Sequence, residues 1–119
     1  MKNFSIVLLC LIFCAVPSFA ASWRLISSDS GIRCSVDVDG IQRHGRYGMA
    51  WIRSIYPNGD RDYSRVVLND QTKEFFLADM LKFNKQGQLL EKIHFSHPHL
   101  DRIDSLGVIR YVHALIWPR

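Results

Sequence analysis

Residues 47–68 read YGMAWIRSIYPNGDRDYSRVVL, two runs of alternating side chains around a short polar break. In the first run the large side chains of Tyr47, Met49 and Trp51 recur at every second position, which is the period of a β-strand. Asn and Gly at 58–59 tolerate positive φ, the backbone conformation of a tight hairpin turn. The stretch therefore predicts two antiparallel strands joined by a hairpin.

The same period continues on both sides of this hairpin, at 32–38, 73–83 and 89–95, with polar breaks between the later runs. Such alternation is typical of antiparallel strands that have one packed face and one wet face. The run Val36–Gly40, VDVDG, lacks the later acids of a calcium loop, so we interpret it as a strand end and a turn. The side chains expected to share one face of the run 73–83 are Phe75, Leu77, Leu81 and Phe83.

The period changes to that of a helix near the C-terminus. Asp104 or Ser105 is expected to cap this helix, and Pro118 to end it. A single amphipathic helix after a meander is expected to lie across one face of the sheet and cover its apolar side. The predicted fold is α+β, a five- to six-stranded antiparallel meander sheet with one C-terminal helix packed on one face. The apolar stripe of the helix consists of Leu106, Ile109, Val112 and Ile116.

The N-terminal residues have the pattern of a secretory signal. Lys2 is followed by an apolar run, Ile6–Val16, and then by Pro17 and small residues up to Ala20. The run is too short for a membrane span of about 20 residues. We therefore expect a signal peptide at 1–20, cleavage near Ala20, and one mature domain at 21–119 without a membrane span.

A small residue normally precedes the cysteine of a bacterial lipidation signal, whereas Leu9 precedes Cys10 and Phe13 precedes Cys14. We expect no lipid anchor, and a periplasmic or secreted protein, with display on the outer surface as an alternative.

Cleavage removes Lys2, so the 99 remaining residues carry 14 Lys and Arg against 11 Asp and Glu, a net charge of +3. Both signs are interspersed, which is not the basic stripe of a nucleic-acid-binding protein. Cys34 is left without a partner in the mature chain. We expect a buried thiol there, with an intermolecular disulfide as the alternative.

A series of landmarks runs along nearly the whole mature chain. In order they are Trp23, Asp37, Ile41, Gly45, Trp51, the hairpin at 57–60, Ser64, the pair Asn69-Asp70 and a final helix opened by Ser105. By their order and spacing, rather than by any one motif, these landmarks resemble the bacterial surface-adhesin protein E family.

The resemblance implies a small exported protein with a bent antiparallel sheet and a C-terminal helix packed on it. It also implies binding of host matrix or plasma proteins such as laminin, vitronectin and plasminogen, and in one case haem. Other members usually have a Cys at position 70, joined by a disulfide to a Cys at the end of the last helix. This chain has Asp70 there and no Cys after Cys34, so we expect burial of the helix to hold it in place.

Three histidines lie close together at His94, His97 and His99. We interpret them as residues of a solvated strand edge and loop; the alternative is contact with haem or a metal as a small ligand. A structural zinc site needs four ligands, so we expect no dedicated metal site and no cofactor.

Basic side chains near aromatic ones are the candidate contacts for a protein partner, because Arg and Tyr are enriched at interfaces. No nucleophile elbow surrounds Ser64 or Ser105, and no pair of acids suggests acid–base chemistry, so we predict no catalytic residues and no enzyme. An unknown partner in the periplasm is an alternative to a host protein. The candidate partner-binding residues are Arg33, Arg43, Arg46, Arg53, Tyr63 and Arg65.

Overall fold

The structure is a computed structural model that describes residues 22–118. The signal peptide expected at 1–20 lies outside these residues. The described chain runs through eight strands, a 3₁₀ turn and one α-helix. Their bounds are β1 Trp23–Asp29, β2 Ile32–Asp37, β3 Gln42–His44, β4 Tyr47–Ile55, β5 Arg61–Asn69, β6 Glu74–Phe83, β7 Leu89–His94, β8 Asp101–Arg102, η1 Ile103–Ser105 and α2 Gly107–Ile116.

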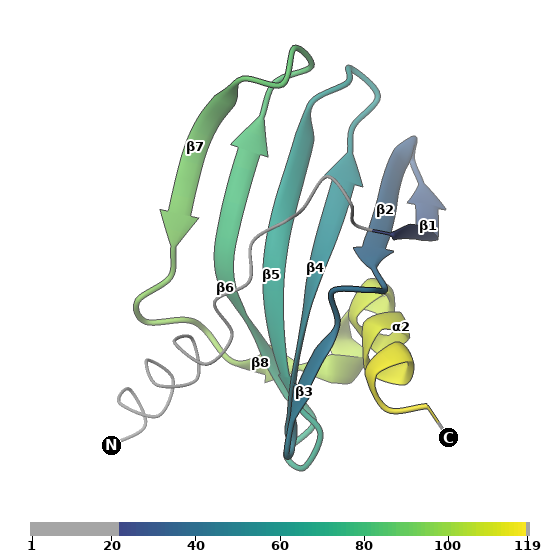
Figure 1. The fold of residues 1–119 in the computed structure, drawn as a ribbon, viewed down its shortest axis with the longest axis vertical. Coiled ribbons are helices and arrows are strands. Elements are labelled where there is room, and N and C mark those ends of the chain that lie inside the picture. Colours follow the sequence, from purple (N-terminus) through teal and green to yellow (C-terminus); the bar gives the residue numbers. More distant parts are fainter. Residues whose placement is uncertain (1–21, 119) are drawn as a thin grey trace.

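The strands form one antiparallel sheet in the order β1-β2-β4-β5-β6-β7 (Figure 1). The two short strands extend this path: β3 pairs with β4 beyond the end of β2, and β8 pairs with β6 beyond the end of β7. The predicted α+β fold, a meander sheet followed by one C-terminal helix, is confirmed.

Turn chemistry explains why the strands end where they do. Gly59 has φ +93°, and its backbone N–H donates to the carbonyl oxygen of Tyr56, which closes the hairpin between β4 and β5. In the next turn the side-chain oxygen of Asn69 accepts hydrogen bonds from the backbone N–H groups of Gln71 and Thr72. The polar breaks in the sequence are therefore the turns of the sheet.

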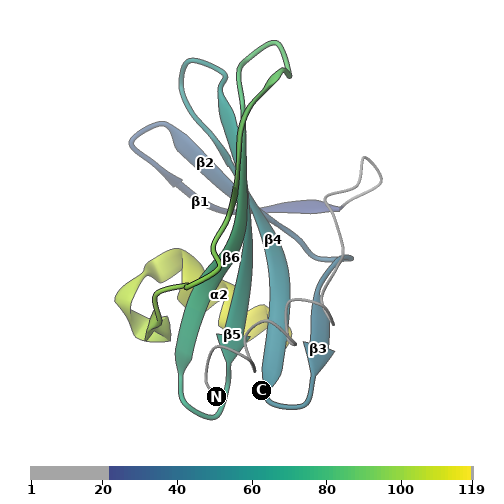
Figure 2. The same ribbon diagram turned by 90° about the vertical axis from the view of Figure 1, so that its left-hand side faces the viewer.

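Helix α2 lies against one face of the sheet (Figure 2). We call this the helix-covered face and define it by Ala50, Ile52, Val66 and Leu68, which are buried with the helix residues. The helix contributes a buried stripe that includes three positions predicted from its period. These buried helix-side residues are Ile109, Val112, Ile116 and Trp117.

The helix begins later than the sequence predicts. Asp104 and Ser105 belong to η1, and the residue that precedes the first helical turn is Leu106, which makes no side-chain capping bond. Ser105 instead donates its hydroxyl to the carbonyl oxygen of Arg102 at 2.6 Å. The predicted cap is thus wrong because the serine closes the preceding turn. Among residues 22–118 no helix is long and apolar enough to cross a membrane.

The helix covers the face that carries the smaller side chains of β4. A Cβ placed on Gly48 would lie 2.7 Å from Ile116 and 2.9 Å from the Trp117 ring. Glycine at this position is what lets the end of the helix approach the strand. The larger Met49 and Trp51 point to the other face and are also buried. The prediction of one packed and one wet face is therefore wrong.

A β-bulge in β6 exchanges the faces of its two halves. Val66 pairs with Leu77 and Arg65 with Asp79, so Ala78 is an extra residue on β6. Because side chains alternate along a strand, one extra residue moves every later side chain to the other face. Phe75 and Leu77 therefore pack on the helix-covered face, whereas Leu81 packs on the opposite one. The prediction that Phe75, Leu77, Leu81 and Phe83 share one face is wrong for this reason.

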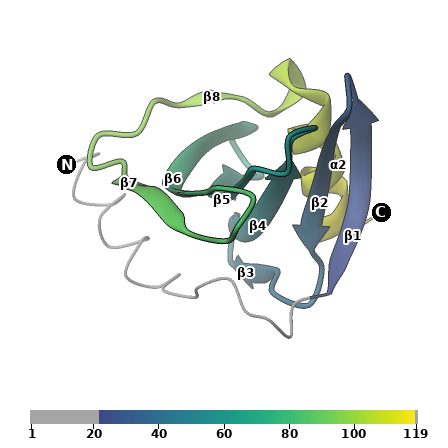
Figure 3. The ribbon, with the colours of Figure 1, turned by 90° about the horizontal axis from the view of Figure 1, so that it is seen from above.

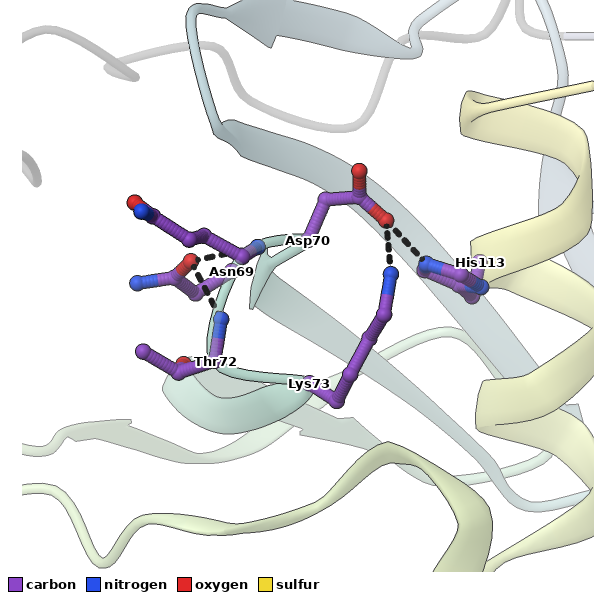
Figure 4. Close-up of polar contacts among 6 residues, drawn as sticks. Asn69, Asp70, Thr72, Lys73 and His113 are labelled. Carbon is purple, nitrogen blue, oxygen red and sulfur yellow. Dashed lines mark hydrogen bonds and ion pairs between the residues drawn. The ribbon is translucent and has the colours of Figure 1, made fainter.

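A polar contact joins the helix to the turn between β5 and β6 (Figure 4). The carboxylate of Asp70 accepts a hydrogen bond from the Lys73 ammonium at 2.7 Å, and the same oxygen lies 2.7 Å from His113 Nε2 on α2. The hydrogen bonds from Lys73 and His113 hold the pKa of Asp70 below its usual value. The hydrogen bond between Asp70 and His113 thus ties the turn to the helix, where the resemblance implies a disulfide in other members.

We expect the change Asp70→Asn to lower the free energy of unfolding by about 1 kcal/mol near pH 6. The pKa of Asp70 is lower in the folded chain, so its stabilisation is present above the unfolded pKa, about 3.9, and is lost as the pH falls through the folded value. Urea unfolding of both proteins at several pH values should show the difference shrinking in acid. A difference that is constant with pH would contradict this contact.

Candidate functional site

The face of the sheet opposite α2 carries a second apolar cluster. Figure 3, seen from above, shows α2 on one side of β4 and β5. Within residues 22–118 no helix lies over the opposite face. The buried members of this second cluster are Met49, Trp51, Val67, Phe76 and Ala78. The half-buried residues packed against them are Trp23, Tyr47, Tyr63 and Leu81.

Aromatic rings meet edge to face on this side of the sheet. The ring centroids of Trp23 and Tyr63 are 5.7 Å apart at an interplanar angle of 62°, and those of Tyr63 and Phe83 are 5.5 Å apart at 86°. Such edge-to-face pairs are favourable because the positive ring edge meets the negative ring face. Strands β1, β5 and β6 thus contribute one ring each to a continuous aromatic row.

Arginines surround this row. The Arg53 guanidinium lies 4.6 Å from the centroid of the Trp23 ring, a cation–π contact, and Arg53 is directly opposite Tyr63 in the pairing of β4 with β5. Arg61 and Arg65 lie two residues on either side of Tyr63, on the same face of β5. We call the set the arginine–aromatic patch and define it as Trp23, Arg53, Arg61, Tyr63, Arg65 and Phe83.

Arg65 is the most buried of these arginines, with 8 % of its side chain exposed, and it forms an ion pair with Asp79 on β6. The second carboxylate oxygen of Asp79 lies 2.7 Å from Nδ1 of His94 on β7. A guanidinium in such a place needs a nearby anion, because removal of a charge from water is costly unless it is paired. Asp79 is therefore the counter-ion that allows Arg65 to be buried in the patch.

The Nε–H groups of Arg53, Arg61 and Arg65 are buried and have no hydrogen-bond partner in the described part of the chain. A buried donor left unpaired costs about 1–3 kcal/mol. The three groups lie on one face, around one tyrosine. The described chain therefore leaves these three buried donors without an acceptor.

The structure separates the six predicted partner-binding residues into two groups. Arg53, Tyr63 and Arg65 lie together in the patch, and Arg33 is exposed beyond it, opposite Ile55. The other two lie at the far end of β4. The Arg43 guanidinium is 5.6 Å from the centroid of the Trp117 ring, and Arg46 donates a hydrogen bond to Gln71.

Sequence reasoning missed Trp23, Arg61 and Phe83 of the patch, and Asp79 beside it. Arg61 could have been found, because Arg61, Tyr63 and Arg65 recur at period two in a predicted strand. Asp79 could not, because its place opposite Arg65 depends on the extra residue at Ala78.

The three histidines lie as the sequence predicts, at a solvated strand edge and in the loop after it. His94 is on β7 and bonds Asp79, whereas His97 and His99 are exposed in the segment that follows β7. Within residues 22–118 no three His, Cys, Asp or Glu side chains are grouped so as to hold a metal ion.

Two polar residues outside the patch have structural contacts. Asp37 is buried and its carboxylate accepts hydrogen bonds from the backbone N–H groups of Ser22 and Gly40, both at 3.2 Å, which confirms the predicted turn. Cys34 is a half-buried free thiol 3.5 Å from the hydroxyl oxygen of Ser54. The prediction of a buried thiol is therefore only partly confirmed.

Comparison with known proteins adds no relative. No family model, no curated protein and no solved structure matches this chain. The resemblance to the surface-adhesin protein E family stays a prediction from the sequence.

Proposed function

We propose that this is an exported, non-enzymatic binding protein that engages a protein partner through the arginine–aromatic patch. The resemblance to surface-adhesin protein E suggests the class of partner: host extracellular-matrix or plasma proteins such as laminin, vitronectin and plasminogen. The observation that carries the proposal is the row of Trp23, Tyr63 and Phe83 edged by arginines on the sheet face opposite α2.

Residue type supports binding at this patch. Trp, Tyr and Arg are the side chains most enriched among those that dominate binding energy at protein interfaces. The aromatic contacts hold Trp23, Tyr63 and Arg53 in place before a partner arrives, so little side-chain entropy is lost on binding. The patch also lies on β-strands, which position side chains more rigidly than loops do.

The experiment is to measure binding of the chain from residue 21 to 119, which holds every described strand and helix, to immobilised laminin, vitronectin and plasminogen. We expect saturable binding to at least one of them. The double change Arg53→Ala with Tyr63→Ala should weaken it at least tenfold, since residues of these types commonly contribute about 2 kcal/mol or more at interface centres.

The matched control is Arg110→Ala, which removes one positive charge from the exposed surface of α2, on the other side of the sheet. It should bind as the unchanged chain does. Absence of saturable binding to all three proteins, or an equal loss with Arg110→Ala, would count against the proposal.

A further inference from the structure

The patch has an excess of positive charge without neutralising partners. Neither Arg53 nor Arg61 forms an ion pair with any residue of the described chain 22–118. Two carboxylates adjoin the patch. Both oxygens of Asp79 are engaged, by Arg65 and His94, and Asp37, opposite Trp23, accepts backbone hydrogen bonds from Ser22 and Gly40. Strand register adds exposed Arg33 and Lys92 to the same face. Charge complementarity therefore favours an anionic partner.

The planar shape of the arginine guanidiniums favours carboxylates as binding partners. A guanidinium is a planar fork whose parallel N–H groups bind both oxygens of a carboxylate, and such bonds are stronger than neutral ones. Arg53 and Arg61 are half-buried, and the Arg53 guanidinium is held against the Trp23 ring, so these cations lie beside apolar side chains and are less mobile than charges on side chains free in water.

The spacing favours an extended segment. Arg53 is opposite Tyr63, and Arg61 comes two residues before Tyr63 on β5, which makes Arg53 and Arg61 diagonal neighbours about 7–8 Å apart at the backbone. Alternate side chains of an extended peptide are about 7 Å apart and point the same way. Two acidic residues at positions i and i+2 of such a peptide therefore match the two guanidiniums, and the next residue on that side lies beyond Arg61, which is opposite Phe83 in the pairing of β5 with β6.

We propose that the patch recognises an acidic, extended segment of its partner protein, with alternate carboxylates held by Arg53 and Arg61 and an aromatic side chain packed on Phe83. This inference rests on the proposed function and names the chemistry of its partner. Sulfated polysaccharide is the competing anionic macromolecule. It lacks the aromatic group that the apolar floor of the patch suits.

The test uses a short synthetic peptide that alternates Glu with Tyr and Thr, a matched peptide with Gln in place of Glu, and heparin. We expect the Glu peptide to bind the chain 21–119 and the Gln peptide to bind at least tenfold more weakly, because a charge-assisted bond to each guanidinium is lost. Arg53→Gln and Arg61→Gln should each weaken the Glu peptide about tenfold, and Arg110→Gln should not.

Arg53→Lys and Arg61→Lys keep the charge but lose the fork, so they provide folded variants in which binding should still fall several-fold. Equal binding of the two peptides, no loss in these variants, or patch-dependent binding of heparin without the Glu peptide would each overturn the inference. The proposed function is tested separately. If a matrix protein binds through the patch while the two peptides bind alike, the inference fails and the proposed function stands. If the Glu peptide binds through the patch but none of the host proteins does, the inference stands and the proposal of a host partner fails.

Discussion

Replacing Asp79 by leucine alone is expected to lower the free energy of unfolding by about 3 kcal/mol, because it leaves a buried guanidinium without its counter-ion. The Arg65 side chain is 8 % exposed and Asp79 is 18 % exposed, so water cannot take the place of the lost carboxylate. His94 loses its partner in the same substitution. Urea unfolding monitored by fluorescence would measure the change.

The matched control is the double change Arg65→Met with Asp79→Leu, which removes both charges and keeps similar volume. Replacement of a buried ion pair by apolar residues is often neutral or stabilising, so the double variant should regain most of the loss. A double variant as unstable as the Asp79→Leu protein would contradict the assigned role of Asp79, since the cost would then not come from the uncompensated charge.

The second large effect is expected from Gly48→Val. Its Cβ would meet Ile116 at 2.7 Å and Trp117 at 2.9 Å, so the end of α2 must move away from β4. Overpacking of this kind costs about 1–3 kcal/mol, more than the fraction of a kcal/mol that a β-branched residue gains in a strand. We expect a net loss of about 2 kcal/mol and a red shift of Trp117 emission.

Gly107→Ala is the control for that substitution. Gly107 is the first residue of α2, and a Cβ there would meet nothing within 4 Å. Alanine is a better helix former, so this variant should be as stable as the unchanged chain or slightly more stable. If Gly48→Val were also neutral, the close approach of helix and strand would be wrong.

Much of this fold could be predicted from local sequence, because local features determine it. Alternation of Tyr47, Met49 and Trp51 and the Asn58-Gly59 turn are properties of neighbouring residues, and both predictions hold. Which face the helix covers is not local. It depends on Gly48 meeting Ile116, residues far apart in the chain.

The candidate site, like the fold, combines features that local sequence predicts with features that depend on distant residues. Arg53 and Tyr63 belong to two strands joined by one hairpin, so counting from the turn predicts that they are neighbours. The pairing of Arg65 with Asp79 follows from a bulge that has no sequence signal of its own. Arg43 was grouped with the wrong residues because its contact with Trp117 depends on the placement of the helix.

The placement of the helix and the pairing of Arg65 with Asp79 connect the fold to the proposed function. Because small residues of β4 receive the helix, the larger aromatic residues and the arginines lie on the opposite face. The ion pair with Asp79 keeps Arg65 in that face. The same packing that stabilises the domain therefore presents the side chains suited to binding.

Hydroxyl-radical footprinting of the chain 21–119, with and without the matrix or plasma protein that it binds, most directly tests whether a partner occupies the face opposite the helix. Trp23 and Tyr63 lie in the arginine–aromatic patch, whereas Tyr111 is 61 % exposed on α2. We expect oxidation of Trp23 and Tyr63 to fall when the partner is present, and oxidation of Tyr111 to stay the same. Protection of Tyr111 with no change at Trp23 and Tyr63 would contradict the account.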